Sequence, residues 1–325
     1  MFELLIALAL LCGLLGGGLV WFLKNPLLFS DDMSAPGDIR ADPVRLEADV
    51  RHLAASAPAR AFHNVAALNA AADYIETEFR KAGCTPERQT FPVGGYDYHN
   101  IVCSFGPADA PRVVIGGHYD VAGDDNPGAD DNASAVAGVL ELARLIERAN
   151  PEFSHRLDLV AYSLEEPPNF RTANMGSFVH AKSLAGARAG VKLMISVEMI
   201  GYFSDAPGSQ AYPLPFLNLI YPDRADFIGV IGQPFDRARV ARVKSLMRVS
   251  DALPVHSINA PALVPGIDLS DHWSYWQHGV PAVLVSDTAF LRNPNYHLPS
   301  DTADTLDYRR MALTVDGLFQ VAVNF

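Results

Sequence analysis

Histidine and acidic side chains stand together at four places where the chain leaves an apolar segment. These places hold, in chain order, His118 with Asp120 and Asp130, Glu165 with Glu166, Glu198, and His297. Open α/β sheets place their sites at the carboxyl ends of their strands, so we expect these side chains to meet there. Imidazole and carboxylate ligands in this mixture suit Zn²⁺, and the chain has no cysteine cluster that would make a structural zinc site. The pattern therefore favours a catalytic metal site.

The first of these places predicts how one ligand is oriented and how two cations are linked. His118 ends the buried-strand signal Arg112–His118, and Asp120 lies two residues further on the same face of the extended chain. Asp120 can accept the second imidazole N–H of His118 and fix its tautomer. Two neighbouring cations need a bridging carboxylate. We expect Asp130 to bridge, because Pro127–Ala129 allows a tight turn beneath the strand end.

Glu165 and Glu166 are adjacent carboxylates that point in opposite directions at a strand end. One of the two can bind metal while the other reaches the attacking water as a general base. Glu198 interrupts the apolar stretch Leu193–Ile200, where a buried unpaired carboxylate would be costly. We interpret Glu198 as a metal ligand rather than the partner of a base.

Five motifs together resemble peptidase family M28, the zinc aminopeptidases, from about Val44 to the C-terminus. They are Gly116-Gly-His118-Tyr-Asp120, Gly128-Ala-Asp130-Asp131-Asn-Ala-Ser134, Glu165-Glu166, Glu198-Met-Ile-Gly201 and Tyr296-His297. The resemblance implies that one zinc is held by Asp130, Glu166 and His297. It implies that the other is held by Asp130, Glu198 and His118, and that a cis peptide follows the bridging residue at Asp130–Asp131.

Two features of the motifs bear on these roles. The family commonly has Asp where this chain has Glu198, and the added methylene changes the reach of the ligand. His272 and His278 lie in the same region as His297, and only the motif, with Pro299 and Asp301 after the histidine, selects His297. Ser270-Asp271-His272 cannot form a hydrolytic triad from three consecutive residues, and we interpret it as a loop near the rim of the site.

The resemblance implies a two-zinc exopeptidase that removes residues from peptide or aminoacyl substrates with a free N-terminus. Glu165 would remove a proton from the attacking water and later protonate the departing amine. One alternative is a glutaminyl cyclase, which shares this fold but uses one zinc. The other alternative is a non-catalytic binding module, and the presence of all five ligand positions and of Glu165 argues against it.

The hydrophobic pattern predicts a three-layer α/β/α fold with a mostly parallel, mixed central sheet, and the resemblance implies the zinc-exopeptidase (phosphorylase/hydrolase-like) architecture. Expected helices are Arg45–Ala55, Val65–Ala82, Ser134–Ala149, Arg171–Leu184, Pro234–Ala252 and Arg309–Val321. Expected strands are Arg88–Pro92, Asn100–Phe105, Arg112–His118, Arg156–Leu164, Val191–Ile200, Pro254–Ile258 and Pro281–Ser286. Helices and strands alternate from Arg112 onward, which is typical of parallel sheets covered by helices.

The beginning of the chain predicts attachment to a membrane. Residues 4–23 are all apolar or Gly, long enough to cross ~30 Å of hydrocarbon. We expect an anchor or uncleaved signal at 1–24, a linker at 25–42 and the M28-like domain at 43–325. Lys24 mildly favours a cytoplasmic body, whereas N-terminal helices commonly direct export of the domain behind them; we expect an extracytoplasmic domain. The net charge of −12 without a Lys/Arg block makes nucleic acid an unsuitable partner. The sequence leaves the oligomeric state open.

Cys84 and Cys103 flank a predicted hairpin around Gly94 and Gly95. A disulfide between them is geometrically possible in an oxidising compartment, and two buried thiols are the alternative. Cys12 lies within the apolar run.

Overall fold

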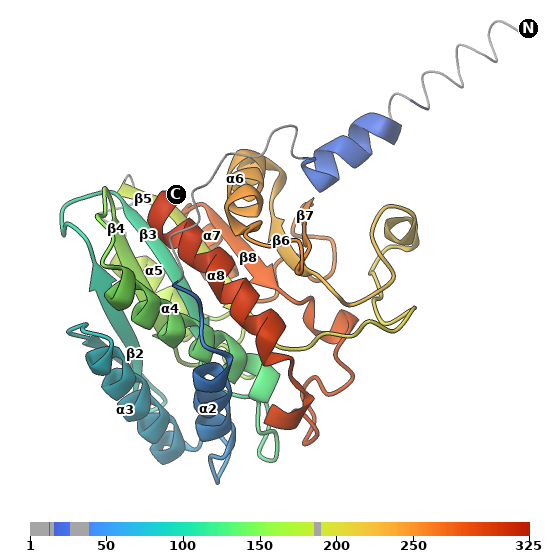
Figure 1. Ribbon diagram of the computed structural model, residues 1–325. Helices are drawn as coiled ribbons and strands as arrows, with labels where there is room; N and C mark the ends of the chain where they lie inside the picture. The colour runs from blue at the N-terminus through green and yellow to red at the C-terminus, as the bar shows by residue number, and fades with distance from the viewer. Residues whose placement is uncertain (1–12, 14–15, 27–38, 185–189) are drawn as a thin grey trace, which may run out of the picture.

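The computed structural model describes residues 13, 16–26, 39–184 and 190–325. Eight strands form one mixed sheet (Figure 1). Their order across the sheet is β1 (Glu87–Val93), β2 (Tyr96–Phe105), β4 (Arg156–Tyr162), β3 (Arg112–His118), β5 (Val191–Glu198), β8 (Ala282–Ser286), β6 (Ile228–Gly232) and β7 (Val255–Asn259). The four central strands β4, β3, β5 and β8 run parallel, while β1, β2 and β6 pair antiparallel to a neighbour.

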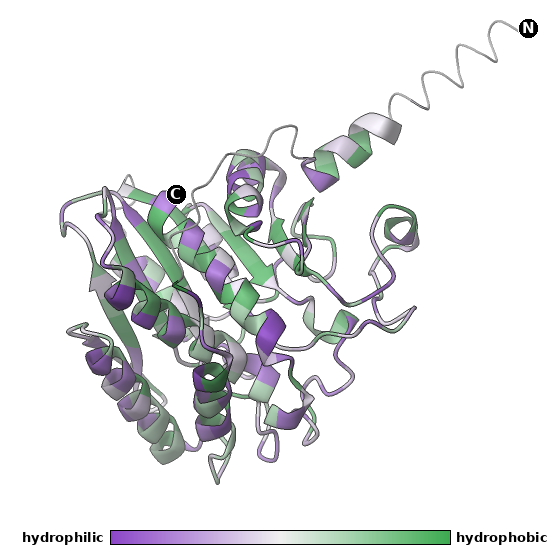
Figure 2. Ribbon diagram, in the orientation of Figure 1, coloured by the Kyte–Doolittle hydropathy of each residue, from purple (hydrophilic) through white to green (hydrophobic). Residues whose placement is uncertain are grey.

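Helices cover both faces of this sheet, which confirms the predicted three-layer α/β/α fold (Figure 1). One layer contains α2 (Pro43–Ala54), α3 (Val65–Lys81), α4 (Ala135–Ala149), α6 (Arg237–Met247) and α8 (Tyr308–Asn324). The other contains α5 (Gly176–Ser183) and α7 (His272–Gln277). The strands are mainly hydrophobic, and the outward helix faces carry the hydrophilic residues (Figure 2). Strands covered on both sides read as nearly continuous apolar runs, which explains why β3 and β5 were predictable.

Three helices of the larger layer are joined by buried ion pairs around Arg144 of α4. The Arg144 guanidinium lies 2.6 Å from a carboxylate oxygen of Asp49 in α2 and 2.8 Å from one of Glu78 in α3. Tyr74 donates a further hydrogen bond of 2.6 Å to Asp49. Because a buried charge is stable only when it is paired, these contacts fix how α2 and α3 lie against α4. The same helix α4 directly follows the irregular segment Ala129–Ser134.

The observed elements differ from the predicted ones at a few points. The predicted helix Arg171–Leu184 begins only at Gly176, because the residues after the Pro167-Pro168 pair form turns instead. The sequence did not indicate β6, whose five residues include two glycines and carry little strand signal. It also did not indicate the six-residue helix α7. Both additions extend the predicted architecture without changing it.

A disulfide joins Cys84 and Cys103, which resolves the two alternatives left by the sequence. Cys84 follows α3 and Cys103 lies in β2, so the bond links that helix to the edge of the sheet. Both residues are buried.

Part of the predicted membrane segment, residues 4–12, 14 and 15, lies outside the described residues, as does most of the predicted linker, 27–38. Residues 16–24 are helical and pack at one end against the body (Figure 1). Within the described residues, no helix combines the length and the apolar character needed to span a bilayer.

Candidate metal centre

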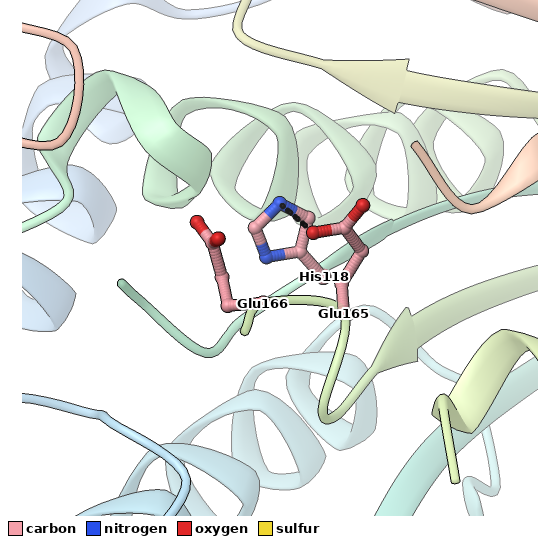
Figure 3. Close-up of side chains that lie close together, drawn as sticks. All are labelled: His118, Glu165 and Glu166. Carbon is pink, nitrogen blue, oxygen red and sulfur yellow. Dashed lines mark ion pairs between the residues drawn. The ribbon is translucent and has the colours of Figure 1, made fainter. Parts of the chain in front are cut away.

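Three parallel neighbours in the sheet bring the predicted ligands to one edge. His118 is the last residue of β3 and Glu198 the last of β5, and Glu165 and Glu166 follow the end of β4. Because β4, β3 and β5 are adjacent and parallel, their carboxyl ends lie side by side. Figure 3 shows the side chains of Glu165 and Glu166 diverging from adjacent positions to lie on either side of the His118 imidazole. The two side chains thus point in opposite directions, as the sequence predicted.

Five side chains form two overlapping groups that could each hold a metal ion. One group is His118, Asp131 and Glu198, and the other is Asp131, Glu166 and His297; within each group the ligand atoms lie within 4.8 Å of one another. His118, Glu165 and Glu166 form a further group by the same measure. Asp131 links the first two groups. Its Oδ1 lies 3.4 Å from Nε2 of His118, and its Oδ2 lies 3.0 Å from Nε2 of His297.

The ligand atoms in these groups are arranged to bind a metal ion rather than to form hydrogen bonds with one another. Oδ1 of Asp131 and Nε2 of His297 are buried and have no hydrogen-bond partner within the described part of the chain. Buried polar atoms are normally satisfied, so such atoms need a partner. An imidazole and carboxylate set with carboxylate oxygens on two sides fits Zn²⁺ or a similar cation. The residues present therefore fit the metal that the sequence predicted.

The structure does not place Asp130, the predicted bridging residue, in either group. Its Oδ1 accepts a hydrogen bond of 2.9 Å from the Gly201 backbone N–H, and its Oδ2 accepts one of 2.7 Å from the Asn293 amide. Asp301 accepts hydrogen bonds from the backbone N–H groups of both Asp130 and Asp131, which fixes the loop so that only Asp131 faces the histidines. The candidate bridging ligand is therefore Asp131.

The backbone around the site has further departures from regular structure. The cis peptide that the sequence placed at Asp130–Asp131 lies one residue later, at Asp131–Asn132. Leu164, Met199 and His297 adopt positive φ angles of 64°, 46° and 58°. Such angles are uncommon for non-glycine residues and tend to gather at functional sites. Leu164 and Met199 are direct neighbours of the candidate residues Glu165 and Glu198 in the chain.

Asp120 occupies the supporting position that the sequence predicted. Its Oδ1 lies 3.4 Å from Nδ1 of His118, whose Nδ1 also lies 3.2 Å from the Asp120 carbonyl oxygen. The same carboxylate accepts hydrogen bonds from the backbone N–H groups of Glu165 and Glu166, at 3.1 and 3.0 Å. One fully buried side chain thus positions a histidine and two glutamates, so Asp120 is a positioning residue rather than a ligand.

Two residues that the sequence did not single out for a role hold the carboxylate of Glu198. Ser270 donates a hydrogen bond of 2.7 Å, and Asn132 donates one of 3.2 Å, to its Oε2. Ser270 is fully buried, so the segment that the sequence placed at the rim lies inside the protein. Nε2 of His272 faces the carbonyl oxygen of Ile267 at 2.7 Å, away from the site. Nothing in the sequence around Ser270 indicated this role.

Electrostatics separate the two neighbouring aspartates. Burial would raise the pKa of Asp131, but its contacts with the imidazoles of His118 and His297 outweigh burial and hold its pKa below the usual range. Burial and the neighbouring carboxylate of Asp287 raise the pKa of Asp130 well above its usual value. The surroundings of Asp131 therefore favour its ionised form, as a ligand needs, whereas those of Asp130 disfavour it.

The other acidic groups show how strongly this edge of the sheet concentrates negative charge. Burial, followed by the charge of Asp131, raises the pKa of Glu166 to about 7. Burial also raises the pKa of Glu165 well above its usual value. Burial opposes protonation of His118, yet the carboxylates of Glu198 and Glu165 outweigh it and raise the pKa of His118 well above normal. Such a cluster gains from a bound cation, which compensates the buried negative charge.

A cavity opens beside Glu198 and extends between β6, β8 and the short helix Pro215–Leu219. Apolar side chains make up most of its wall, including Leu217, Tyr221, Ile231, Val264, Ile267 and Leu284. Glu198 is the one acidic residue that lines it within the described part of the chain. Glu198 is the one candidate ligand that lines the cavity, so the cavity lies next to the group that also contains His118 and Asp131.

Comparison with known proteins adds to this geometry. Residues 100–322 match the model of peptidase family M28. The uncharacterised protein YfbL of Escherichia coli K12 is 49% identical over 291 residues, covering 87% of this chain and 88% of the relative. The zinc aminopeptidase BSAP of Bacillus subtilis has a similar fold, with a TM-score of 0.69 at 13% identity over 87% of this chain and 95% of that one. A glutaminyl cyclase of Bacteroides thetaiotaomicron is similar too, with a TM-score of 0.64 at 15% identity over 88% and 99%.

Proposed function

Because this chain belongs to peptidase family M28, we propose that it is an aminopeptidase that uses two zinc ions bound at the edge of the sheet. The observation that carries the proposal is the position of Asp131 between two groups of ligands, each of which includes one histidine and one glutamate. We propose His118 and Glu198 for one ion, His297 and Glu166 for the other, and Asp131 for both. Asp130 has no place in this set.

Charge balance supports two divalent cations rather than one. Five buried carboxylates, those of Asp120, Asp131, Glu165, Glu166 and Glu198, lie beside the two histidines. With both imidazoles neutral, two divalent cations compensate four of these negative charges, whereas one compensates only two. Uncompensated buried charge is strongly destabilising. The structural neighbours include both aminopeptidases and a glutaminyl cyclase, so the fold alone does not decide between these activities.

The residues of the proposed site then have specific roles in the reaction. When bound, the zinc ions supply Lewis acidity that polarises the scissile carbonyl and acidifies water. Glu165 takes the proton of the attacking water and returns it to the departing amine. Asp120 holds His118 and the backbone of Glu165 and Glu166 in place through the contacts of its carboxylate. The ordering of three groups by one carboxylate limits the reorganisation needed during the reaction.

The cavity beside Glu198 supports a preference for apolar N-terminal residues. Its wall is apolar and its acidic end lies at the metal ligands, so a free amine and its side chain can be accommodated together. An apolar side chain gains by leaving water, whereas a charged one loses its hydration there. Leucine and phenylalanine are therefore the proposed N-terminal residues.

A panel of aminoacyl-p-nitroanilides tests the proposed activity on the full-length protein. Leucyl and phenylalanyl substrates should be hydrolysed about 10- to 200-fold faster than alanyl or glutamyl substrates, because methylenes in an apolar pocket discriminate by that order. Chelation should abolish turnover and zinc should restore it. N-acetyl-leucyl-p-nitroanilide is the matched control and should not react. Equal cleavage of the acetylated substrate would contradict an aminopeptidase. One zinc per chain with cyclisation of N-terminal glutamine would instead identify a glutaminyl cyclase.

We further propose that the N-terminal segment anchors the protein in a membrane and that the catalytic domain is extracytoplasmic. The apolar run at 4–23 supports the anchor. The bond between Cys84 and Cys103 supports an oxidising compartment, because disulfides are rare in the cytosol.

Thiol trapping tests the compartment directly. In protein denatured straight from acid-quenched cells, a maleimide should label Cys84 and Cys103 only after reduction. A Cys84→Ser variant is the control, because it frees the Cys103 thiol for labelling without reductant. Labelling of both cysteines in the unreduced wild-type protein would place the domain in a reducing compartment.

A further inference from the structure

The described end of the N-terminal segment is held by three different parts of the body. The side-chain amide of Asn259, at the end of β7, donates to the carbonyl oxygen of Phe22 at 2.8 Å. Lys244 of α6 donates to the carbonyl oxygen of Lys24 at 2.6 Å. Lys24 in turn donates to the carbonyl oxygen of Ile220, just after the helix Pro215–Leu219, at 2.6 Å. The segment therefore leaves the body at a fixed place, next to α6 and β7 (Figure 1).

The three most exposed large apolar side chains of the described residues lie beside these contacts. They are Phe235, Leu219 and Leu263, which are 92%, 86% and 84% exposed. Leu219 directly precedes Ile220 in the chain, and Leu263 lies shortly after Asn259. Phe235 lies just before Arg237, whose guanidinium carbon is 4.0 Å from the centroid of the Trp21 ring. We call Leu219, Phe235 and Leu263 the apolar collar.

The apolar collar is more than a set of scattered exposed side chains. Single exposed apolar side chains are normal on soluble proteins, but several on one face mark an interaction site. Phe216, Leu19 and Trp21 are also large, apolar and exposed, and they belong to the same loop as Leu219 or to the segment itself. Six of the ten large apolar side chains that are exposed among the described residues thus belong to this segment or to the loops that hold it.

The charge of α6 distinguishes this face from the rest of the protein. Its sequence Arg237–Met247 contains no acidic residue, although the whole chain carries a net charge of −12. Arg237, Arg239 and Arg242 reach the surface, with Arg239 paired to Asp236 just before the helix, whereas Lys244 is buried against Lys24. Basic residues beside a membrane segment attract anionic lipid headgroups, and tryptophan favours the headgroup level. The combination of apolar side chains, Trp21 and a basic helix is complementary to a bilayer surface.

We propose that the apolar collar docks on the lipid bilayer in which the N-terminal segment is anchored, so that the catalytic domain is held in one orientation. The inference rests on the proposed membrane anchor and does not require the proposed activity. The cavity beside Glu198 shares Leu217 and Tyr221 with the loop of the collar, and Nζ of Lys24 lies 5.3 Å from the centroid of the Tyr221 ring. Docking therefore places the substrate cavity close to the membrane surface, where apolar N-termini of membrane-associated peptides are accessible.

Depth-dependent fluorescence quenching tests this orientation in the full-length protein. Single cysteines at Leu219, Phe235 or Leu263, in a Cys12→Ser background, are labelled with an environment-sensitive fluorophore. The proteins are reconstituted in vesicles of phosphatidylcholine and phosphatidylglycerol that contain nitroxide-labelled lipid. Interfacial side chains insert roughly 5–10 Å, so all three probes should lose about half of their fluorescence or more. Tyr96, which is 61% exposed in the hairpin at the opposite edge of the sheet, is the matched control and should not be quenched.

A fourth probe at Leu19 separates docking from anchoring. Quenching at Leu19 without quenching at the collar would overturn the docking proposal while leaving the anchor intact. The absence of quenching at Leu19 would remove both. Collar probes that are shielded from soluble iodide but not quenched by lipid would show that a protein partner or a second copy covers this face, which also overturns the proposal. The p-nitroanilide assay, run on the same vesicles, reports on the proposed activity independently.

Discussion

Replacing Asp131 with Asn should abolish turnover and metal retention, whereas the same change at Asp130 should leave both largely intact. Asp131 belongs both to the group with His118 and Glu198 and to the group with Glu166 and His297. Replacing Asp131 with Asn therefore removes one negative charge from both groups of ligands. Changes to residues that merely support a ligand typically cost about 10–100-fold, so the loss for Asp131→Asn should exceed about 100-fold.

Asp130→Asn is a matched control because it makes the same chemical change one residue away. Asp130 is fully buried and bound to Gly201 and Asn293, so we expect a loss of stability of about 1–3 kcal/mol rather than a loss of chemistry. Zinc content by atomic emission, leucyl-p-nitroanilide turnover and urea unfolding distinguish the two outcomes. If Asp130→Asn loses zinc and Asp131→Asn keeps it, the assignment reverses to the one expected from sequence.

The sequence could not distinguish these aspartates because the deciding contacts come from distant parts of the chain. Asp301, which fixes the backbone N–H of Asp130, is 171 residues away, and Gly201, which binds the Asp130 carboxylate, is 71 residues away. Strand periodicity assigns faces only within regular strands, and both aspartates lie in an irregular segment before α4. Two identical neighbouring side chains therefore give no local signal for which one turns inward.

Other parts of the site were predictable because regular structure controls them. His118 and Glu198 end buried strands, and the parallel order of those strands brings their ends together. Glu165 and Glu166 diverge as neighbouring residues at a strand end do. Ser270 was not predictable as a partner of Glu198, because a serine in a loop carries no signal of burial or direction. The same limit applied to the fold. Strand β6 was not predicted, because it is short and rich in glycine and therefore has little strand pattern.

Replacing Glu165 with Gln should lower kcat by about 10²–10⁴-fold while zinc remains bound, because that is the usual contribution of a positioned general base. Glu165 belongs to neither of the groups that contain Asp131. Its Oε2 lies 3.9 Å from Nε2 of His118, so the carboxylate faces the reaction space beside the ligands. Glutamine preserves the shape and hydrogen-bonding reach of the side chain but cannot accept a proton from water.

Glu166→Gln provides the comparison, because the two residues are adjacent and both are buried. Oε1 of Glu166 lies 3.2 Å from Nε2 of His297, and the carboxylate belongs to the group that also contains Asp131. This change should reduce zinc content, and added zinc should restore part of the activity. Glu165→Gln should keep its zinc, show a nearly unchanged KM and gain nothing from added metal, because only the transition state is affected. Loss of zinc from Glu165→Gln would make Glu165 a ligand, and full activity would leave the proton transfer to another group.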